Sequence, residues 1–141
     1  MATKVRLTGV QAMQRKLAAI SDRFGDRAAG ALFRFAERRV ATPAKQQYVP
    51  VDFGVLKGEI IVFAPQRRGF TISVTIAAGT GASAPYALAI HEHPSKYSPP
   101  SWRGTTVTFH PSGRGPKYLE KPLMAAVASA AQELAADLVL K

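Results

Sequence analysis

The stretch Glu59–Ile76, EIIVFAPQRRGFTISVTI, decides the fold class of this chain. Its first run, EIIVFA at 59–64, predicts a strand, and QRRG at 66–69 predicts a turn after it. The second run alternates apolar and hydroxyl residues, which is typical of a strand with one buried face. The apolar residues that we expect to point inward are Phe70, Ile72, Val74 and Ile76. Together the two runs predict an antiparallel hairpin.

A long amphipathic helix is predicted before this hairpin, over residues 9–42. Thr8 and Gln11 have the spacing of a capping box, and apolar residues then follow at steps of three and four. We expect the helix to end or kink at Thr42-Pro43, because the residue before a proline disfavours the helical region. The apolar seam of the first half of this helix consists of Val10, Met13, Leu17, Ile20 and Phe24.

A second helix is predicted over residues 118–140, and its apolar residues also fall on one face. Residues 48–110, between the two helices, form the loop and sheet region, with a further strand at 105–109. Helices at both ends of a small, mainly antiparallel sheet make an α+β fold, and 141 residues fit a single domain, 1–141. The apolar face of the second helix consists of Leu123, Val127, Ala130, Ala131, Leu134 and Leu138.

The composition excludes several classes of protein. The chain has no cysteine, which excludes a disulfide scaffold, a thiol nucleophile, a zinc finger and an iron–sulfur cluster. Residues 1–10 have no apolar core of signal-peptide length, and no stretch has the pattern of a membrane span. The hydrophobic fraction of 47% and the charged fraction of 20% are those of an ordinary globular protein.

The net charge of +10 is concentrated near one end of the chain. Ten of the 19 basic residues, but only three of the nine acidic ones, lie in residues 1–45. Five cations of the predicted first helix follow one another at steps of 7, 4, 7 and 4, which puts them within about 60° of one another around the helix axis. This basic stripe consists of Lys16, Arg23, Arg27, Arg34 and Arg38. We expect it to face an anionic surface, either DNA or an acidic protein; a merely solvated face is the alternative.

No arrangement of residues indicates a catalytic centre. His91, Glu92 and His93 form the one cluster with metal-ligand character, and His110 is the natural candidate for a third ligand. The cluster lacks the HExxH spacing, and the central segment has no paired carboxylates for acid–base work. We therefore expect no catalytic residue, no metal and no cofactor, and a metal-dependent hydrolase using His91, His93 and Glu92 is kept only as a third hypothesis.

Residues 93–104 predict an irregular loop that contains three prolines. Its Tyr97, Trp102 and Arg103 are suited either to stacking on nucleobases or to packing against protein. A loop of this length with two large aromatic side chains has little reason to exist in a monomer. We expect it to contact another subunit and to bury Trp102 there.

Three separate segments together resemble one protein family. Residues 49–57, VPVDFGVLK, resemble a VPVDTGxLxxS loop, with Phe53 where threonine or serine is usual. Tyr86-Ala87 with Ile90-His91-Glu92 resembles a YAxxxHE segment, and residues 110–123, HPSGRGPKYLEKPL, are similar to HxxGxxKYLExPL. Order, spacing and total length agree over roughly residues 8–140. The family is the HK97 gp10-like group of small phage morphogenesis proteins.

The resemblance implies a structural, non-enzymatic protein of the head-to-tail junction of a tailed phage, a neck or tail-completion component. It implies a location in the virion after synthesis in the bacterial host cytoplasm, and no membrane. The implied partners are other copies in a ring, neighbouring connector, stopper or tail-terminator proteins, and DNA in the lumen. It also implies positioning roles for Pro50, Asp52, Gly54, Leu56, Tyr86, His91, Glu92, His110, Gly113, Tyr118, Leu119 and Glu120. The competing hypothesis is a stand-alone basic nucleic-acid-binding domain.

Overall fold

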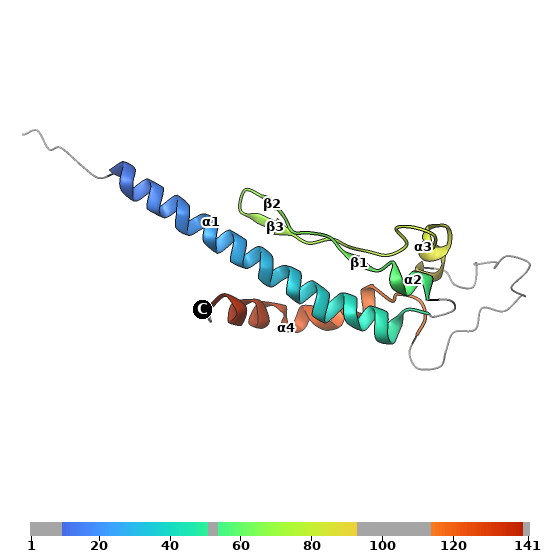
Figure 1. Cartoon of the computed structure of the whole chain (residues 1–141). Helices are drawn as coiled ribbons and strands as arrows, with labels where there is room; N and C mark the ends of the chain where they lie inside the picture. Colours follow the sequence, from blue (N-terminus) through green and yellow to red (C-terminus); the bar gives the residue numbers. More distant parts are fainter. Residues whose placement is uncertain (1–9, 51–53, 93–113, 140–141) are drawn as a thin grey trace, which may run out of the picture.

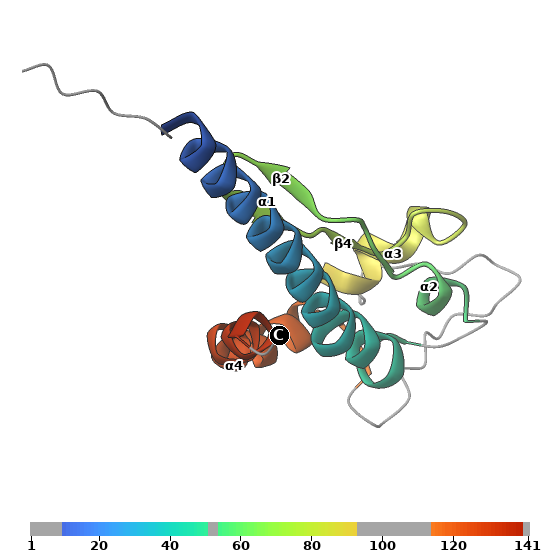
Figure 2. The same cartoon turned by 60° about the vertical axis from the view of Figure 1, so that its left-hand side comes forward.

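The computed structural model describes residues 10–50, 54–92 and 114–139. Its longest element is helix α1 (Val10–Phe35) (Figure 1). A hairpin lies along one side of α1, and the C-terminal helix α4 (Glu120–Val139) lies along another side (Figures 1 and 2). Helices at both ends of the chain, with short antiparallel strands between them, confirm the predicted α+β class.

The N-terminal helix continues through the proline that was expected to end it. After α1 the backbone forms two π-helical segments, η1 (Ala36–Ala41) and η2 (Ala44–Tyr48), and Thr42 and Pro43 between them keep helical dihedral angles. In a regular α-helix the proline ring clashes with the carbonyl four residues earlier, whereas π-helical turns are wider and bond residue i to residue i+5. Of the two predicted outcomes, an end or a kink at Thr42-Pro43, the end is wrong, and we attribute the continuation to these wider turns.

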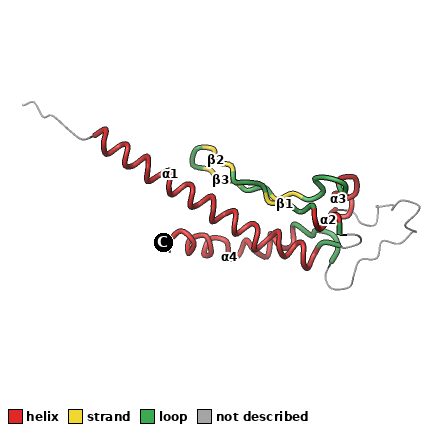
Figure 3. The backbone as a smooth tube through the Cα atoms, viewed as in Figure 1, coloured by secondary structure: helices red, strands yellow, loops and turns green. Residues whose placement is uncertain are grey.

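The hairpin consists of two short antiparallel ladders placed end to end (Figure 3). Strand β1 (Ile61–Val62) pairs with β4 (Ile76–Ala77), and β2 (Gln66–Arg68) pairs with β3 (Thr71–Ser73). The turn begins at Gly69, whose φ of +61° is a conformation that two-residue hairpin loops reserve for glycine and a few polar residues. The predicted turn lies too early in the chain, because its first three residues form β2.

The alternation predicted for the second strand is confirmed except at its first residue. The half-buried residues are Ile72, Val74 and Ile76, and the exposed ones are Thr71, Ser73 and Thr75. Phe70, which was expected to point inward, is fully exposed. That expectation is wrong because Phe70 lies in the turn, outside the paired part of the strand.

Two shorter helices flank the hairpin in sequence. Helix α2 (Val55–Gly58) is a single turn before β1, and α3 (Ala84–Glu92) follows β4. The strand predicted over 59–64 is reduced to β1, because Glu59 caps the end of α2 and only Ile61 and Val62 pair with β4. The apolar run at 86–91, which sequence reasoning left unassigned, is part of α3.

Helix α4 agrees with the predicted C-terminal helix apart from its ends, but its buried side is shifted around the helix axis and overlaps the predicted face only in part. Pro122 and Ala126 are buried, while Leu123 and Val127 are 46% and 58% exposed. The expected face is therefore partly correct, since Ala130 and Leu134 pack against the core, and its exposed part follows from Glu133 and Asp137, which turn toward arginines of the N-terminal helix.

The core has two clusters that meet around the end of the N-terminal helix. The smaller one joins α1 and η1 to α4 through Phe35, Val40 and Ala126. The larger one joins η1 and η2 to α2, α3 and the residues before α4; its buried members are Ala41, Ala44, Val49, Leu56, Ile60, Ala87, Ile90 and Tyr118.

The first half of α1 adds no large side chain to either cluster. The five residues of its apolar seam are between 48% and 65% exposed. Helix α4 runs antiparallel to α1, and its last turn reaches only Arg27, whose Nη2 donates a hydrogen bond to the carbonyl of Leu138 at 2.9 Å. Helix α4 therefore covers the apolar side of the second half of α1 only. Among the described residues, the apolar seam of the first half stays exposed.

Candidate functional site

The three segments that carry the family resemblance meet in the larger core cluster. The first segment supplies Val49 and Leu56, the second supplies Ala87 and Ile90, and the third supplies Tyr118. All five side chains are at most 7% exposed. We call this convergence the motif junction. Its residues are separated by up to 69 positions in the chain, so their convergence is a property of the fold.

The first segment enters the motif junction through a turn that glycine permits. Gly54 has a φ of +78° at the start of α2, a left-handed conformation that costs other residues steric strain. The chain then turns so that Leu56 is buried, at 4% exposure. Pro50 is half-buried at the end of η2, and Asp52 lies outside the described residues.

Tyr118 is the largest fully buried side chain of the motif junction. Its hydroxyl donates a hydrogen bond to the carbonyl of Ala87 at 3.2 Å, and its ring makes an edge-to-face contact with His91 at a centroid distance of 4.8 Å. Burial, and to a smaller degree Tyr86, raises the pKa of Tyr118 to about 12. The residue therefore stays neutral over the physiological range and ties the third segment to the second.

An ion-pair network at the rim of the motif junction joins the same two segments. Glu92 accepts hydrogen bonds from Lys117 Nζ at 2.5 Å and, on its other oxygen, lies 2.8 Å from His91 Nδ1. Lys117 also pairs with Glu120 at 3.1 Å. The Lys117 ammonium, followed by His91, lowers the pKa of Glu92, and Glu92 in turn raises the pKa of Lys117. Lys117 holds a left-handed φ of +61°, rare for a residue with a side chain.

Arg114 makes a contact that sequence reasoning missed. Its Nη1 donates to the carbonyl of Val49 at 2.8 Å, and its Nη2 donates to the carbonyl of Gln46 at 2.6 Å. These carbonyls lie at the C-terminal end of η2, where helical backbone leaves acceptors unpaired and a cation is favourable. The two groups are 65 or more positions apart, so no local sequence pattern signals the contact.

Glu59 was also missed, although its environment is well defined. Its Oε2 accepts hydrogen bonds from the backbone N–H groups of Gly81 and Ser83 and from the Ser83 hydroxyl. Ser83 directly precedes α3, where the unpaired N–H groups of a helix favour a carboxylate. The hydrogen bond from Ser83 lowers the pKa of Glu59. Glu59 thus fixes the loop before α3 to the end of α2.

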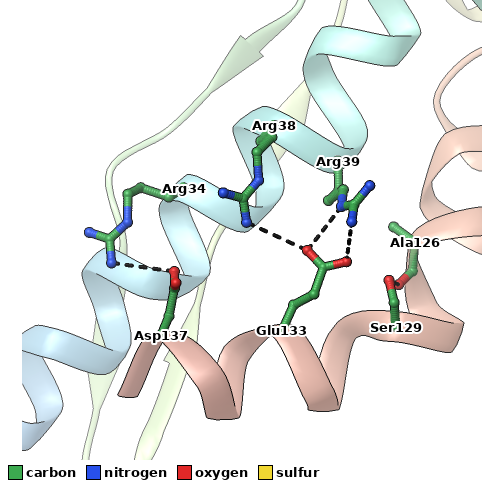
Figure 4. A network of polar contacts seen from close by, with 7 residues as sticks. All are labelled: Arg34, Arg38, Arg39, Ala126, Ser129, Glu133 and Asp137. Carbon is green, nitrogen blue, oxygen red and sulfur yellow. Dashed lines mark hydrogen bonds and ion pairs between the residues drawn. The ribbon is translucent and has the colours of Figure 1, made fainter. Parts of the chain in front are cut away.

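Three of the five residues of the basic stripe bind helix α4 of the same chain, and Figure 4 shows two of them, Arg34 and Arg38. Arg34 lies 3.5 Å from Asp137, and Arg38 lies 3.5 Å from Glu133. Arg39, outside the predicted stripe, binds both oxygens of Glu133 at 2.9 and 2.5 Å. This contact, with a smaller contribution from Ser129, lowers the pKa of Glu133. The third stripe residue is Arg27, which binds the end of α4 as described above.

The prediction that the stripe faces another molecule stays a prediction, but part of the stripe already has partners within the chain. Its second half faces an anionic surface, but that surface belongs to the same chain. Lys16 and Arg23 lie beyond the end of α4 and have no acidic partner among residues 10–50, 54–92 and 114–139. Asp22, on the same helix, pairs instead with Arg67 of β2 at 3.6 Å. Lys16 and Arg23 are thus the stripe residues without an acidic partner in the described part of the chain, while Arg34 and Arg38 remain 59% and 60% exposed as they bind α4.

Several predicted site residues lie outside the described residues. They are Asp52, His93, Tyr97, Trp102, Arg103, His110 and Gly113. Within the described part of the chain, His, Asp and Glu side chains form no group of three that is suited to a metal ion. Among the same residues, no helix combines the length and the apolar character that crossing a membrane requires.

The structure brings together most of the remaining motif residues. Leu56, Tyr86, His91, Tyr118 and Leu119 lie in or against the motif junction, with Glu92 and Glu120 in the ion-pair network at its rim. Comparison with protein-family models, with curated proteins and with solved structures gives no significant match for this chain.

Proposed function

We propose that this chain is a structural protein of the head-to-tail junction of a tailed bacteriophage. In this proposal it is a neck or tail-completion component of the virion that forms a ring, or joins one, around the DNA passage. The observation that carries the proposal is the motif junction: three segments that resemble one family by sequence also form one core in space. A chance resemblance of three short segments gives no reason for such convergence.

The way in which the motif residues are used supports a structural role. Tyr118 and Leu56 are buried, and Glu92 is bound by Lys117, so these side chains hold backbone segments together. A catalytic centre normally gathers polar groups around a concave, accessible site. In the motif junction the charged groups bind one another at the rim, and the inside is filled mainly by apolar side chains, although His91 Nε2 is buried without a hydrogen-bond partner among the described residues.

The structure also bears on the choice between an assembly subunit and a stand-alone DNA-binding domain. Arg34 and Arg38 pair with carboxylates of α4, and Arg27 binds its backbone, which offsets part of the positive charge that a DNA-binding helix would offer. The remaining excess of positive charge favours a position near DNA, because a net charge of +10 attracts phosphate at long range. A subunit next to a DNA passage accommodates both observations.

The decisive experiment inactivates the gene in the phage or prophage that carries it. We expect lysates to contain DNA-filled heads and separate tails by electron microscopy, and wild-type protein supplied from a plasmid to restore joined particles. A plasmid-borne Leu56→Asp variant should fail to restore them, since it places a charge in the motif junction, whereas Lys57→Asp, on the exposed neighbour, should restore them. Normal joined particles in the absence of the protein would overturn the proposal.

A second measurement addresses the DNA-binding alternative. The variant Lys16→Gln with Arg23→Gln removes the two stripe residues that lie beyond α4, and Arg15→Gln with Lys57→Gln is the control with the same change in charge. If the free protein binds DNA through the stripe, the first variant should reduce the slope of log affinity against log salt by about 2, and the control should not. Tight binding to free DNA by a protein absent from purified particles would favour the alternative.

A further inference from the structure

The outward side of helix α4 carries no charge over most of its length. Among residues 122–139, every exposed residue is apolar except Gln132. The two charged residues in this range, Glu133 and Asp137, both bind arginines of the N-terminal helix. We call the exposed apolar side of α4 its outer face; its large residues are Leu123, Met124, Val127 and Val139, with exposures of 46% to 82%.

In α4 the charged residues face the protein and the apolar residues face solvent, which is the opposite of the usual arrangement in a surface helix. A helix at a protein surface normally buries its apolar stripe and turns its charges to water. Contiguous exposed apolar surface is typical of a protein interface, and the centre of an interface is depleted of charged residues. The outer face of α4 therefore indicates contact with another polypeptide.

The first half of α1 presents a second uncovered apolar surface, which is its apolar seam. Met13, Leu17 and Ile20 are 55% to 65% exposed, and α4 ends before it reaches them. The free part of α1 extends beyond the end of α4 in both views of the fold (Figures 1 and 2). The seam from Val10 to Phe24 spans about 21 Å and the outer face from Leu123 to Val139 spans about 24 Å, at 1.5 Å per residue. The two surfaces are thus matched in length and in apolar character.

Charge decides how these surfaces combine between two copies. If two α1 seams packed together antiparallel about a twofold axis, Lys16 and Arg23 would lie beside the same two residues of the partner. Like charges facing one another across an interface are unfavourable. A symmetric pair of α4 outer faces would leave the α1 seam of each copy uncovered. Packing the seam of one copy against the uncharged outer face of another covers both surfaces and opposes no like charges.

We propose that the apolar seam of α1 in one copy binds the outer face of α4 in a second copy. This interface is head-to-tail, because each copy uses a different surface on each side. Head-to-tail contacts repeat, and they generate a closed ring when the rotation between neighbours closes. The inference deepens the proposed function by naming the contact between subunits, and only the closure into a ring rests on that function.

Cysteine cross-linking tests the proposal directly, because the chain has no cysteine of its own. One full-length variant carries Leu17→Cys, and three others carry Met124→Cys, Val127→Cys or Ala131→Cys. Equal mixtures of the Leu17 variant with each α4 variant are treated with a short bismaleimide. We expect a covalent dimer in at least one mixture, no dimer from any variant alone, and longer covalent chains or rings when both cysteines are in one polypeptide. A Gln47→Cys and Lys57→Cys mixture, at exposed sites away from both surfaces, is the control.

The other outcomes overturn the proposal in distinguishable ways. Cross-linking of the Leu17 variant alone indicates a symmetric α1 pair, and cross-linking of an α4 variant alone indicates a symmetric α4 pair. If no mixture cross-links but light scattering shows an oligomer, the inference fails and the proposed function stands. A protein that is monomeric at every concentration contradicts the inference and leaves only the form of the proposed function in which the chain joins a ring made by another protein.

A substitution in the apolar seam of α1 gives a second test of the interface, with self-association as the quantity measured. Ile20→Gln on the seam should weaken self-association by at least about tenfold, because large apolar anchors dominate interface energies. Gln14→Ala, on another face of the same helix, should leave it unchanged. Both positions are exposed in the single chain, so circular dichroism and thermal unfolding of the two variants should match the wild type at protein concentrations too low for self-association. Equal self-association of the two variants would contradict the assigned surface.

Discussion

Tyr118 joins two of the motif segments through both ends of its side chain. Its ring contacts His91, and its hydroxyl reaches the backbone of Ala87, although the three residues come from two distant parts of the sequence. A tyrosine in a core needs a partner for its hydroxyl, and here the carbonyl of α3 supplies one. The residue therefore fixes both the distance and the orientation between α3 and the start of α4.

Replacing Tyr118 with phenylalanine tests this role. The carbonyl of Ala87 lies within α3 and keeps its helical environment, so the loss should be that of one hydrogen bond, about 1 kcal/mol in the free energy of unfolding. The measurement is chemical denaturation at neutral pH. Tyr48→Phe, a half-buried control, should change the free energy less.

The same variant should alter stability in alkali. The pKa of Tyr118 is raised from 10.0 to about 12, so the unfolded chain loses this proton at lower pH than the folded chain does. Its stabilising contribution is therefore complete below about pH 10 and is lost as pH rises toward 12. Tyr118→Phe should flatten the decline of stability between pH 10 and 12. Identical slopes in the variant and the wild type would contradict the raised pKa.

Both the backbone conformation at position 79 and the close packing around it require glycine. Its φ is +70°, and a Cβ at this position would lie 2.4 Å from the Cβ of Ala87 and 3.4 Å from the backbone of Ala84. Neither neighbour is the flexible end of a long side chain. We expect Gly79→Ala to destabilise the protein by about 2 kcal/mol or more in thermal or denaturant unfolding. Gly58→Ala, in α2 with no atom within 4 Å of the new Cβ, should be neutral or slightly stabilising.

At the scale of elements, α1 and α4 are joined by an apolar contact and by a row of ion pairs. The apolar part is small, with Phe35 and Ala126 buried, while Arg34, Arg38 and Arg39 stay half-exposed as they bind α4. Single exposed pairs contribute little to stability, but Glu133 receives two arginines and one of them binds it through both oxygens. Glu133 is thus the residue of this contact whose loss should be most visible.

Glu133→Gln should lower the unfolding temperature at neutral pH, and Glu120→Gln should lower it less. The pKa of Glu133 is lowered by Arg39, so its contribution is present above the ordinary value of 4.5 and is lost as pH falls through the lowered pKa. The difference between the variant and the wild type should therefore shrink in acid, and also with added salt. A difference independent of pH would indicate a packing effect instead of an ionic one.

Sequence reasoning succeeded where the signal was local and failed where a distant element decided. The steps of three and four predicted both long helices, and the alternation after Gly69 predicted which side of the hairpin faces inward. The orientation of the Arg34 side chain depends on Asp137, which lies 103 positions away in the chain. The contact of Arg114 with the carbonyl of Gln46 likewise joins residues that are 68 positions apart. Periodicity shows that a helix has an apolar face, but it cannot show how much of that face a shorter helix covers.

At the scale of the whole molecule, the chain is extended and its core lies toward one end. The buried clusters gather around η1, η2 and the start of α4, while α1 and the hairpin continue beyond them (Figure 1). Fourteen large apolar side chains are exposed within the described residues, more than the thirteen apolar residues of the buried core. Much of the apolar surface of this chain is therefore available to be covered on assembly, and binding of a partner then adds to stability by mass action.

The exposed first half of α1 is expected to become ordered later than the rest of the protein. A helix of about 15 residues is only marginally stable in water without tertiary contacts, and the ion pair between Asp22 of this half and Arg67 of the hairpin is partly exposed and contributes little. Backbone amides between Met13 and Phe24 should therefore exchange with deuterium quickly in dilute protein, and amides of η1 should exchange slowly because both core clusters hold them. Raising the protein concentration should slow exchange in the first half of α1 selectively. The first half of α1 would then become fully ordered only after a neighbouring subunit has bound to it, so its amide exchange would report the addition of a subunit.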